Sequence, residues 1–271
     1  MFENRFIYTG SAAGTNARFT RIDPDRNLNH VIPVQAASHL PVTGGLSESR
    51  TSNFSFSVEK PRPMKLFSVA SSFTRAVSDV PTDGKTHTTE ATAVVECLTI
   101  LDWLHVELVR ASLKSVHGPK DSYATITPFD TDIKGLRLGD TLVTVEFDLT
   151  PFQQHGTKTS LAELYKKDAD FRKKNFQRFN AKDADDDKLP ESKGVCIGSL
   201  VKNITIQGKV PSDVVVDGYT IKWPNVGRVI LGEVLITDYY RRLTMLRVQL
   251  GSPVEGQSSS SDLVVNGVTM P

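Results

Sequence analysis

The feature that most constrains this chain is the alternation of apolar and polar residues along many short runs. In the run FSFSV, Phe54, Phe56 and Val58 alternate with serine, and the next run, KLFSVASSF, repeats the pattern. Successive side chains of a β-strand point to opposite faces, so a period of two is typical of strands with one buried face. About ten to twelve such runs separated by turn residues predict a mainly β fold, an antiparallel β-sandwich or a barrel-like pair of sheets.

Three dipeptides between these runs predict tight hairpins. Gly139-Asp140 suits a type II′ turn, whereas Asp217-Gly218 and Asn266-Gly267 suit type I′ turns, which require positive φ at both central residues. The last of these follows the serine-rich stretch GQSSSS. We therefore expect residues 256–271 to form a linker and a C-terminal hairpin.

One run changes its apolar face partway along. Leu104, Val106 and Leu108 share one parity, whereas Val109 and the apolar residues after it share the other. One extra residue in a strand inverts every later side chain, so this pattern predicts a β-bulge between residues 108 and 109.

The segment 160–180 departs from the β pattern. Its apolar residues have helical spacing, and Ser160 and Glu163 match a capping box, which predicts an amphipathic helix inserted between strands. Its apolar positions are Leu161, Leu164, Tyr165, Phe171 and Phe179. The acidic residues 183–187 resemble the start of a calcium-binding loop, but Lys188 and Gly194 stand where such a loop needs glycine and glutamate. We interpret residues 160–194 as an insertion of helix and exposed loop in a single domain of residues 1–271.

Charge and hydropathy limit the partners of this protein. The chain has 32 basic and 31 acidic residues among 271, so no overall basic excess favours nucleic acid as a partner. It contains no apolar run long enough for a transmembrane helix, and its first residues lack the apolar segment of a classical signal peptide. We expect a cytoplasmic protein or one exported by a non-classical route.

Cys97 and Cys196 both lie in apolar, strand-like runs without a CxxC motif. Two cysteines in such runs indicate either two buried thiols or one long-range disulfide, and the sequence leaves both interpretations open.

The segment 89–148 resembles the β-repeat domains of bacterial surface proteins of the choice-of-anchor type. The residues that carry the resemblance are Ala91, Ala93, Val95, Leu98 and Ile100, followed by Ile133, Leu136, Leu138 and Gly139. The resemblance implies a non-catalytic, extracellular β domain, and it transfers no functional residue to this chain.

The histidines do not form a recognisable metal or catalytic motif. His105 and Glu107 share one strand parity, as ligands on a sheet would, but no HExxH, HxH or Cys/His pair occurs. In HVIPVQAASHLPVTGG, His30 and His39 flank proline, which removes hydrogen-bond donors and is typical of an edge strand or connection. Ser38 and Ser47 lie nearby, but the sequence does not match the Gly-x-Ser-x-Gly motif of hydrolases. We predict no catalytic residue, metal or cofactor.

Tyrosine and arginine gather at the predicted turn around residues 238–242. Both residue types are enriched at interface hot spots, and apolar residues near the C-terminus can reach a neighbouring chain. We therefore expect a structural protein that self-associates to a homo-oligomer through Tyr239, Tyr240, Arg241, Arg242, Leu263 and Val265. One alternative is a module that binds carbohydrate or an apolar ligand through Trp103 and Trp223, and another is a hydrolase with an unrecognised site.

Overall fold

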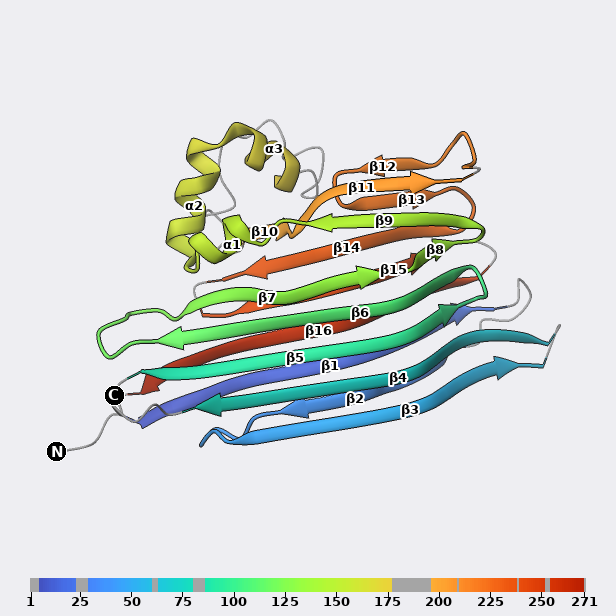
Figure 1. The fold of residues 1–271 in the computed structure, drawn as a ribbon. Helices are drawn as coiled ribbons and strands as arrows, with labels where there is room; N and C mark the ends of the chain where they lie inside the picture. Colours follow the sequence, from blue (N-terminus) through green and yellow to red (C-terminus); the bar gives the residue numbers. More distant parts are fainter. Residues whose placement is uncertain are drawn as a thin grey trace.

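The computed structural model describes residues 5–22, 29–59, 63–79, 86–176, 196–208, 210–237, 239–251 and 254–270. Within them, the chain forms two antiparallel sheets of eight strands each, which pack face to face (Figure 1). The predicted sandwich-like, mainly β fold is confirmed. Both sheets have free edge strands in this part of the chain, so neither closes into a barrel.

Sheet 1 brings the two ends of the chain together at its centre. Its strand order is β12-β13-β14-β15-β16-β1-β2, with β10 pairing on β14. The first and last strands pair along almost their whole length, from Arg5 opposite Met270 to Arg21 opposite Glu255. The strands are β1 (Arg5–Arg21), β2 (His30–His39), β10 (Cys196–Ser199), β12 (Val215–Asp217), β13 (Thr220–Trp223), β14 (Gly227–Ile236), β15 (Arg241–Leu250) and β16 (Glu255–Met270).

Sheet 2 contains the middle of the chain, in the order β11-β9-β8-β6-β5-β4-β3, with β7 pairing on β6. The core lies between the two sheets, where the inward-facing side chains of both are almost completely buried. The strands are β3 (Leu46–Val58), β4 (Met64–Asp79), β5 (His87–Ile100), β6 (Leu104–His117), β7 (Thr125–Lys134), β8 (Leu136–Leu138), β9 (Thr141–Phe147) and β11 (Val201–Gln207).

In the described residues, two short helices, α2 (Lys158–Lys167) and α3 (Ala169–Phe176), lie where one helix was predicted, and a further short helix, α1 (Thr150–Gln154), precedes them. The N-cap of α2 is Thr157, whose hydroxyl accepts the Ser160 N–H at 3.2 Å, so the predicted Ser160–Glu163 capping box is wrong. Asp168 separates α2 from α3 and accepts the Phe171 N–H at 2.8 Å. The remainder of the predicted helix and the acidic loop lie outside the described residues.

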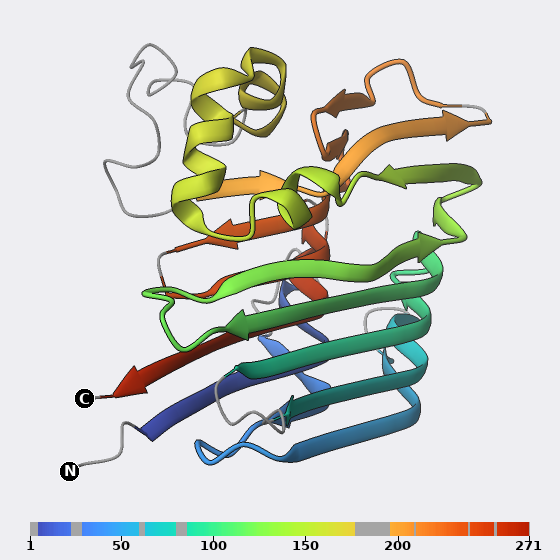
Figure 2. The same cartoon turned by 60° about the vertical axis from the view of Figure 1, so that its left-hand side comes forward.

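The helices pack at the end of the sandwich that holds β10, away from β2 and β3 (Figure 2). As expected for a helix that covers a core, Leu161 and Tyr165 are buried, whereas Leu164 and Phe171 are half-buried. The Tyr165 hydroxyl donates a hydrogen bond to the Ile197 carbonyl at 2.9 Å, which fastens α2 to sheet 1.

The predicted hairpins differ in their outcome. The hairpin at Gly139-Asp140 is confirmed, because Leu138 pairs with Thr141 and Gly139 has a φ of +59°. The next hairpin also forms, but Asp217 pairs with Thr220, so that its central residues are Gly218 and Tyr219. Only Gly218 of these two has positive φ, which is the pattern of a type II′ turn rather than the expected type I′.

The predicted C-terminal linker and hairpin are wrong. Residues 255–270 form one continuous strand, β16, and Asn266 pairs with Thr9 instead of forming a turn. Ser258, Ser260 and Ser261 of the expected linker are buried. Serine looks like a linker residue in the sequence, but here the small hydroxyl side chains fit a crowded central strand and form hydrogen bonds with residues of β1 and β6.

A transverse line of irregular residues, which we call the crease, crosses both sheets. At each position one pair of opposed residues is missing from the strand pairing, but the register is the same on both sides of the gap. Beyond the gap, the residues that face the core change from even to odd positions of the strand or from odd to even. Alternate strands carry a positive φ there, which is uncommon for residues other than glycine. In sheet 1 the crease comprises Ala36, Gly14, Ser261, Met245 and Gly232; in sheet 2 it comprises Asn53, Ala70, Cys97 and Glu107, with Gly135 between β7 and β8.

The crease explains the parity change predicted in β6. The inversion is confirmed, since Val106 and Val109 are both buried. Its cause is not an extra residue, because β5 and β6 keep one register on both sides of the crease. Instead, Cys97 of β5 adopts a φ of +51°, and its side chain is exposed with a free thiol, contrary to both interpretations from the sequence.

The two sheets approach each other closely along the crease. The Ser72 hydroxyl of β4 donates to the Gln35 carbonyl of β2 at 2.7 Å, and the Ser261 hydroxyl of β16 donates to the Val109 carbonyl of β6 at 3.2 Å. A Cβ atom on Gly14 would lie only 1.8 Å from the Ser72 Oγ. Small residues are therefore required where hydrogen bonds connect the sheets.

Candidate functional site

The turn between β14 and β15 presents two of the predicted interface residues. Tyr239 is 64% exposed and Tyr240 is 39% exposed. The Tyr239 ring packs edge-to-face against Tyr123, at 6.3 Å between centroids, and the turn is held by the Thr237 hydroxyl, which accepts the Tyr240 N–H at 3.0 Å. These exposed aromatic rings are available for contact with another molecule.

Other predicted interface residues are structural. Arg241 is only 1% exposed, and its guanidinium donates to the carbonyl oxygens of Phe152 at 3.2 Å and His155 at 2.6 Å. It therefore neutralises the C-terminal carbonyls of α1 and fastens that helix to sheet 1. Leu263 and Val265 are completely buried and face the core. An interface role for these three side chains is wrong, because none of them reaches the surface.

Trp103 and Trp223, the predicted ligand-binding pair, do lie together. Their rings meet edge-to-face at 6.0 Å between centroids, with Trp103 contributed by sheet 2 and Trp223 by sheet 1. Both are half-buried and pack on the core. The pair covers the core between the two sheets rather than forming an exposed flat platform for a sugar ring, so the structure gives the sugar-binding alternative little support.

The catalytic candidates near the start of the chain do not converge. The His30 ring lies against Phe56 at 5.4 Å between centroids, whereas the Ser47 hydroxyl accepts the backbone N–H of His39 at 3.2 Å. The Ser38 hydroxyl is buried and has no hydrogen-bond partner in the described part of the chain. No nucleophile–base pair is formed by these residues, which instead belong to an edge strand and its connection.

The metal candidates are likewise dispersed. His105 shares a hydrogen bond of 3.2 Å with the Thr99 hydroxyl, and Glu107 lies at the crease beside Gly135. Across the described ranges, no group of three or more His, Cys, Asp or Glu side chains is arranged to hold a metal ion. None of the helices there is both long and apolar enough to cross a membrane.

The edge of sheet 1 at β2 displays aliphatic side chains that the sequence analysis did not select. All of them lie on β2, on the connection that follows it or at the start of β3, and each is 45–65% exposed. The sequence signal is the presence of Pro33 and Pro41 in this stretch, each directly before one of the valines, because proline marks an edge strand. We call this set the β2 edge patch: Val31, Val34, Val42 and Leu46.

The backbone of β2 is partly protected against strand addition. Two of its N–H groups donate to side-chain hydroxyls of β3 in the other sheet. The Ala36 N–H donates to the Thr51 hydroxyl at 3.1 Å, and the His39 N–H donates to the Ser47 hydroxyl at 3.2 Å. Pro33 has no N–H to offer. Occupied donors and proline are two ways of blocking an exposed sheet edge. The β2 edge patch can therefore contact a partner through its side chains more readily than through its backbone.

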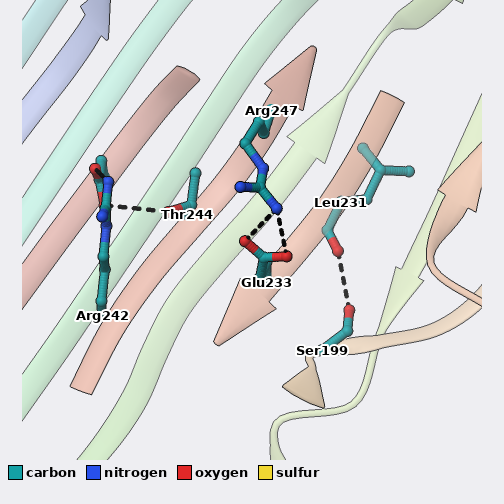
Figure 3. A network of polar contacts seen from close by, with 7 residues as sticks. Ser199, Leu231, Glu233, Arg242, Thr244 and Arg247 are labelled. Carbon is teal, nitrogen blue, oxygen red and sulfur yellow. Dashed lines mark hydrogen bonds and ion pairs between the residues drawn. The ribbon is translucent and has the colours of Figure 1, made fainter. Parts of the chain in front are cut away.

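The outer face of sheet 1 carries a second polar arrangement (Figure 3). Asp262 of β16 forms an ion pair with both Arg242 guanidinium donors and accepts the Thr244 hydroxyl at 3.1 Å. Arg247 forms an ion pair with Glu233 at 2.7 Å. The hydrogen bond to Asp262 raises the pKa of Arg242, whereas burial lowers the pKa of Arg247. Two arginines on one strand thus lie in different electrostatic environments.

Comparison with known families finds a match to a family model. The family model of DUF8256, a domain of unknown function, matches residues 6–189 and 174–237. The chain belongs to this family. A search of curated proteins and a search of solved structures find no match.

The DUF8256 match extends from β1 to the end of β14. It includes the β2 edge patch and both tryptophans, whereas β15 and β16, with Arg242, Arg247 and Asp262, follow the matched residues. The match does not test the resemblance of residues 89–148 to choice-of-anchor domains, which stays a prediction.

Proposed function

We propose that this DUF8256 chain is a non-catalytic structural module that associates with further copies of itself through the β2 edge patch. The observation that carries the proposal is the exposure of four aliphatic side chains along one edge of the sandwich. Exposed aliphatic residues are ordinary when scattered, but their concentration along one edge is typical of an interaction surface. The dispersed histidines and serines support a non-catalytic role.

A second copy is the partner that the chain itself can supply. Sheet 1 ends at β12 on its other side, where Val215 and Val216 are 50% and 42% exposed. The two edges lie at opposite ends of the sandwich (Figure 1). An apolar patch at each end allows the β2 edge of one copy to contact the β12 edge of the next. Such a contact joins two different surfaces, so it builds rings or filaments rather than closed dimers.

Side-chain burial must supply most of the affinity. Because hydroxyls of β3 already occupy two N–H groups of β2, few backbone hydrogen bonds are left to form, and each contributes only about 0.5–1.5 kcal/mol net. Burying one valine or leucine side chain completely contributes about 1.5–3 kcal/mol. The β2 edge patch is therefore the expected energetic centre of the contact.

Multi-angle light scattering tests the proposal. The wild-type chain should show a mass above its monomer mass of 29.8 kDa at about 100 µM, where even weak micromolar association is populated. Replacing Val31, Val34, Val42 and Leu46 with serine should return the mass to the monomer value. Because these residues are exposed, circular dichroism should show an unchanged fold.

The matched control replaces Tyr239 and Tyr240 with serine. These rings are also exposed but lie at the turn between β14 and β15, so this variant should keep the wild-type mass. If only the tyrosine variant lost association, the interface would lie at that turn and not at the β2 edge patch. A wild-type protein that stays monomeric at the same concentration would refute self-association.

A further inference from the structure

We infer that the outer face of sheet 1 holds a binding site for an oxyanion carried on a hydroxylated skeleton. The site is a hollow of about 360 Å³ between β10, β14, β15 and β16, which we call the arginine hollow. Apolar side chains of β10 and β14 form part of its wall, and its polar lining includes Arg228, Arg242, Arg247, Glu233, Gln249 and Ser259.

The charges around the arginine hollow leave a positive surplus. Glu233 neutralises Arg247, and Asp262, which borders the adjoining hollow, neutralises Arg242. Arg228 is exposed and has no ion-pair partner within the residues that the structure describes. Three guanidiniums are thus balanced by two carboxylates, and the remaining positive charge faces the hollow.

Strand register brings the unneutralised arginine close to the others. Arg228 of β14 lies directly opposite Gln249 of β15, and Arg247 precedes Gln249 by two residues on the same face. Diagonal neighbours in an antiparallel pair lie about 7–8 Å apart, within reach of long side chains. Arg228 and Arg247 can therefore approach one anionic group from two sides, and guanidinium is well suited to the planar geometry of carboxylate and to phosphate.

Unused hydrogen-bonding groups favour a ligand with both acceptors and donors. The Arg247 Nε and the Gln249 Oε1 are buried and have no hydrogen-bond partner in the described part of the chain. The first requires an acceptor, such as an oxyanion, and the second requires a donor, such as a hydroxyl group. Both residues line the arginine hollow, and pairing an unsatisfied buried polar group with a ligand is favourable.

The environment of Arg247 is electrostatically mixed. Burial lowers the pKa of Arg247 and the charge of Arg242 lowers it further, whereas Tyr219 and Asp262 raise it. The surplus positive charge at the arginine hollow therefore lies on Arg228, and an anion in the hollow would balance that charge.

Isothermal titration calorimetry on the full chain tests the site with four probes: inorganic phosphate, inorganic sulfate, D-glucuronate and uncharged D-glucose. At least one of the three anions should bind saturably, and the tightest of them names the anionic group. Glucose should not bind measurably. Absence of saturable binding by all three anions, or glucose binding as tightly as glucuronate, would overturn the inference.

Two variants locate the binding. Arg228→Gln should weaken anion binding about tenfold or more, because it removes a charge-assisted hydrogen bond without disturbing an ion pair. Arg172→Gln, on the exposed surface of α3, changes the net charge equally and should leave binding unchanged. Gln249→Ala should weaken glucuronate more than phosphate. Equal loss in the Arg172 and Arg228 variants would show a non-specific charge effect and refute the site.

Discussion

The outer faces of the two sheets carry ion pairs of different kinds. On sheet 2 the pairs are solvated, and every charged partner is more than a third exposed: Arg75–Glu48, Lys114–Glu90, Arg110–Asp130, Lys134–Asp132 and Lys65–Asp102. Sheet 1 also has two solvated pairs, Arg21–Glu255 and Lys222–Asp217. It differs from sheet 2 in that the carboxylates of Glu233 and Asp262 are only 14% and 16% exposed beneath arginine side chains. Solvated ion pairs contribute little to stability because water screens them. Removing one partner of a shielded pair is more destabilising, because it leaves the other charge buried without a counter-ion.

This difference indicates which face has a specific polar architecture. Sheet 2 presents an ordinary solvated surface, and sheet 1 presents hollows in which charge is partly shielded from water. The crease residues of the two sheets also differ in how closely they are packed. Gly14 of sheet 1 lies against Ser72, whereas Ala70 of sheet 2 is exposed.

The largest effect is expected at the crease. Gly14→Ala would place a Cβ atom 1.8 Å from the Ser72 Oγ and 2.3 Å from the Gln35 carbonyl oxygen. Because backbone and side chain would both have to move, we expect a loss of at least about 3 kcal/mol in the free energy of unfolding, measured by urea denaturation. Ala70→Ser, the exposed control in sheet 2, should change it by less than about 0.5 kcal/mol. Equal effects would show that the crease does not hold the sheets together as described.

An intermediate effect is expected for the shielded ion pairs. Asp262→Asn removes a carboxylate that accepts hydrogen bonds from Arg242 and Thr244, and we expect a loss of about 2 kcal/mol. Glu90→Gln, the control, removes the solvated partner of Lys114 and should cost less than about 1 kcal/mol. Chemical denaturation of both variants measures the two losses of unfolding free energy. A larger loss for Glu90→Gln than for Asp262→Asn would contradict the proposed difference between the two sheets.

The smallest effect concerns a contact that joins the sheets near the start of β1. The Tyr8 hydroxyl shares a hydrogen bond of 2.8 Å with the His87 ring, and burial, together with the charge of Asp79, raises the pKa of Tyr8 above 10.0. The folded state therefore holds this proton more tightly than the unfolded chain does. Its contribution is complete below pH 10 and is lost as the pH rises through the raised pKa.

Tyr8→Phe should lower the free energy of unfolding by about 1 kcal/mol at neutral pH, because it removes one hydrogen bond. It should also reduce the decline in stability above about pH 10, as measured by urea unfolding at each pH. If the stability of this variant fell at alkaline pH as steeply as that of the wild type, groups other than Tyr8 would be responsible for the fall.

The sequence predicted those parts of the fold that depend on local pattern. Alternation gave the sandwich, Gly139-Asp140 gave its hairpin, and the parity change in residues 104–113 located the crease in β6. Sequence could not show that the crease crosses both sheets, because Ala36, Cys97 and Ser261 are residue types that rarely adopt a positive φ. Tertiary contacts impose that conformation.

The errors in the predicted interface have a related cause. Arg241 lies in a cluster of polar and aromatic residues that looks like a surface turn, but carbonyl groups of α1 accept its hydrogen bonds inside the protein. Residues 256–261 resemble a linker, yet β1 and β15 pair with them on both sides. Deleting the C-terminal residues would therefore remove a central strand instead of testing an interface. Partners from distant parts of the chain decide both outcomes.

Hydrogen–deuterium exchange at two protein concentrations tests the proposed self-association most directly, because it locates the contact within the wild-type chain. Raising the concentration from about 1 µM to about 100 µM should slow amide exchange along β2, in residues 40–46 and in the β12 hairpin, since these edges meet only between copies. Exchange at the outer face of sheet 2 should not change. Exchange rates that are the same at both concentrations along β2 and β12 would contradict the account.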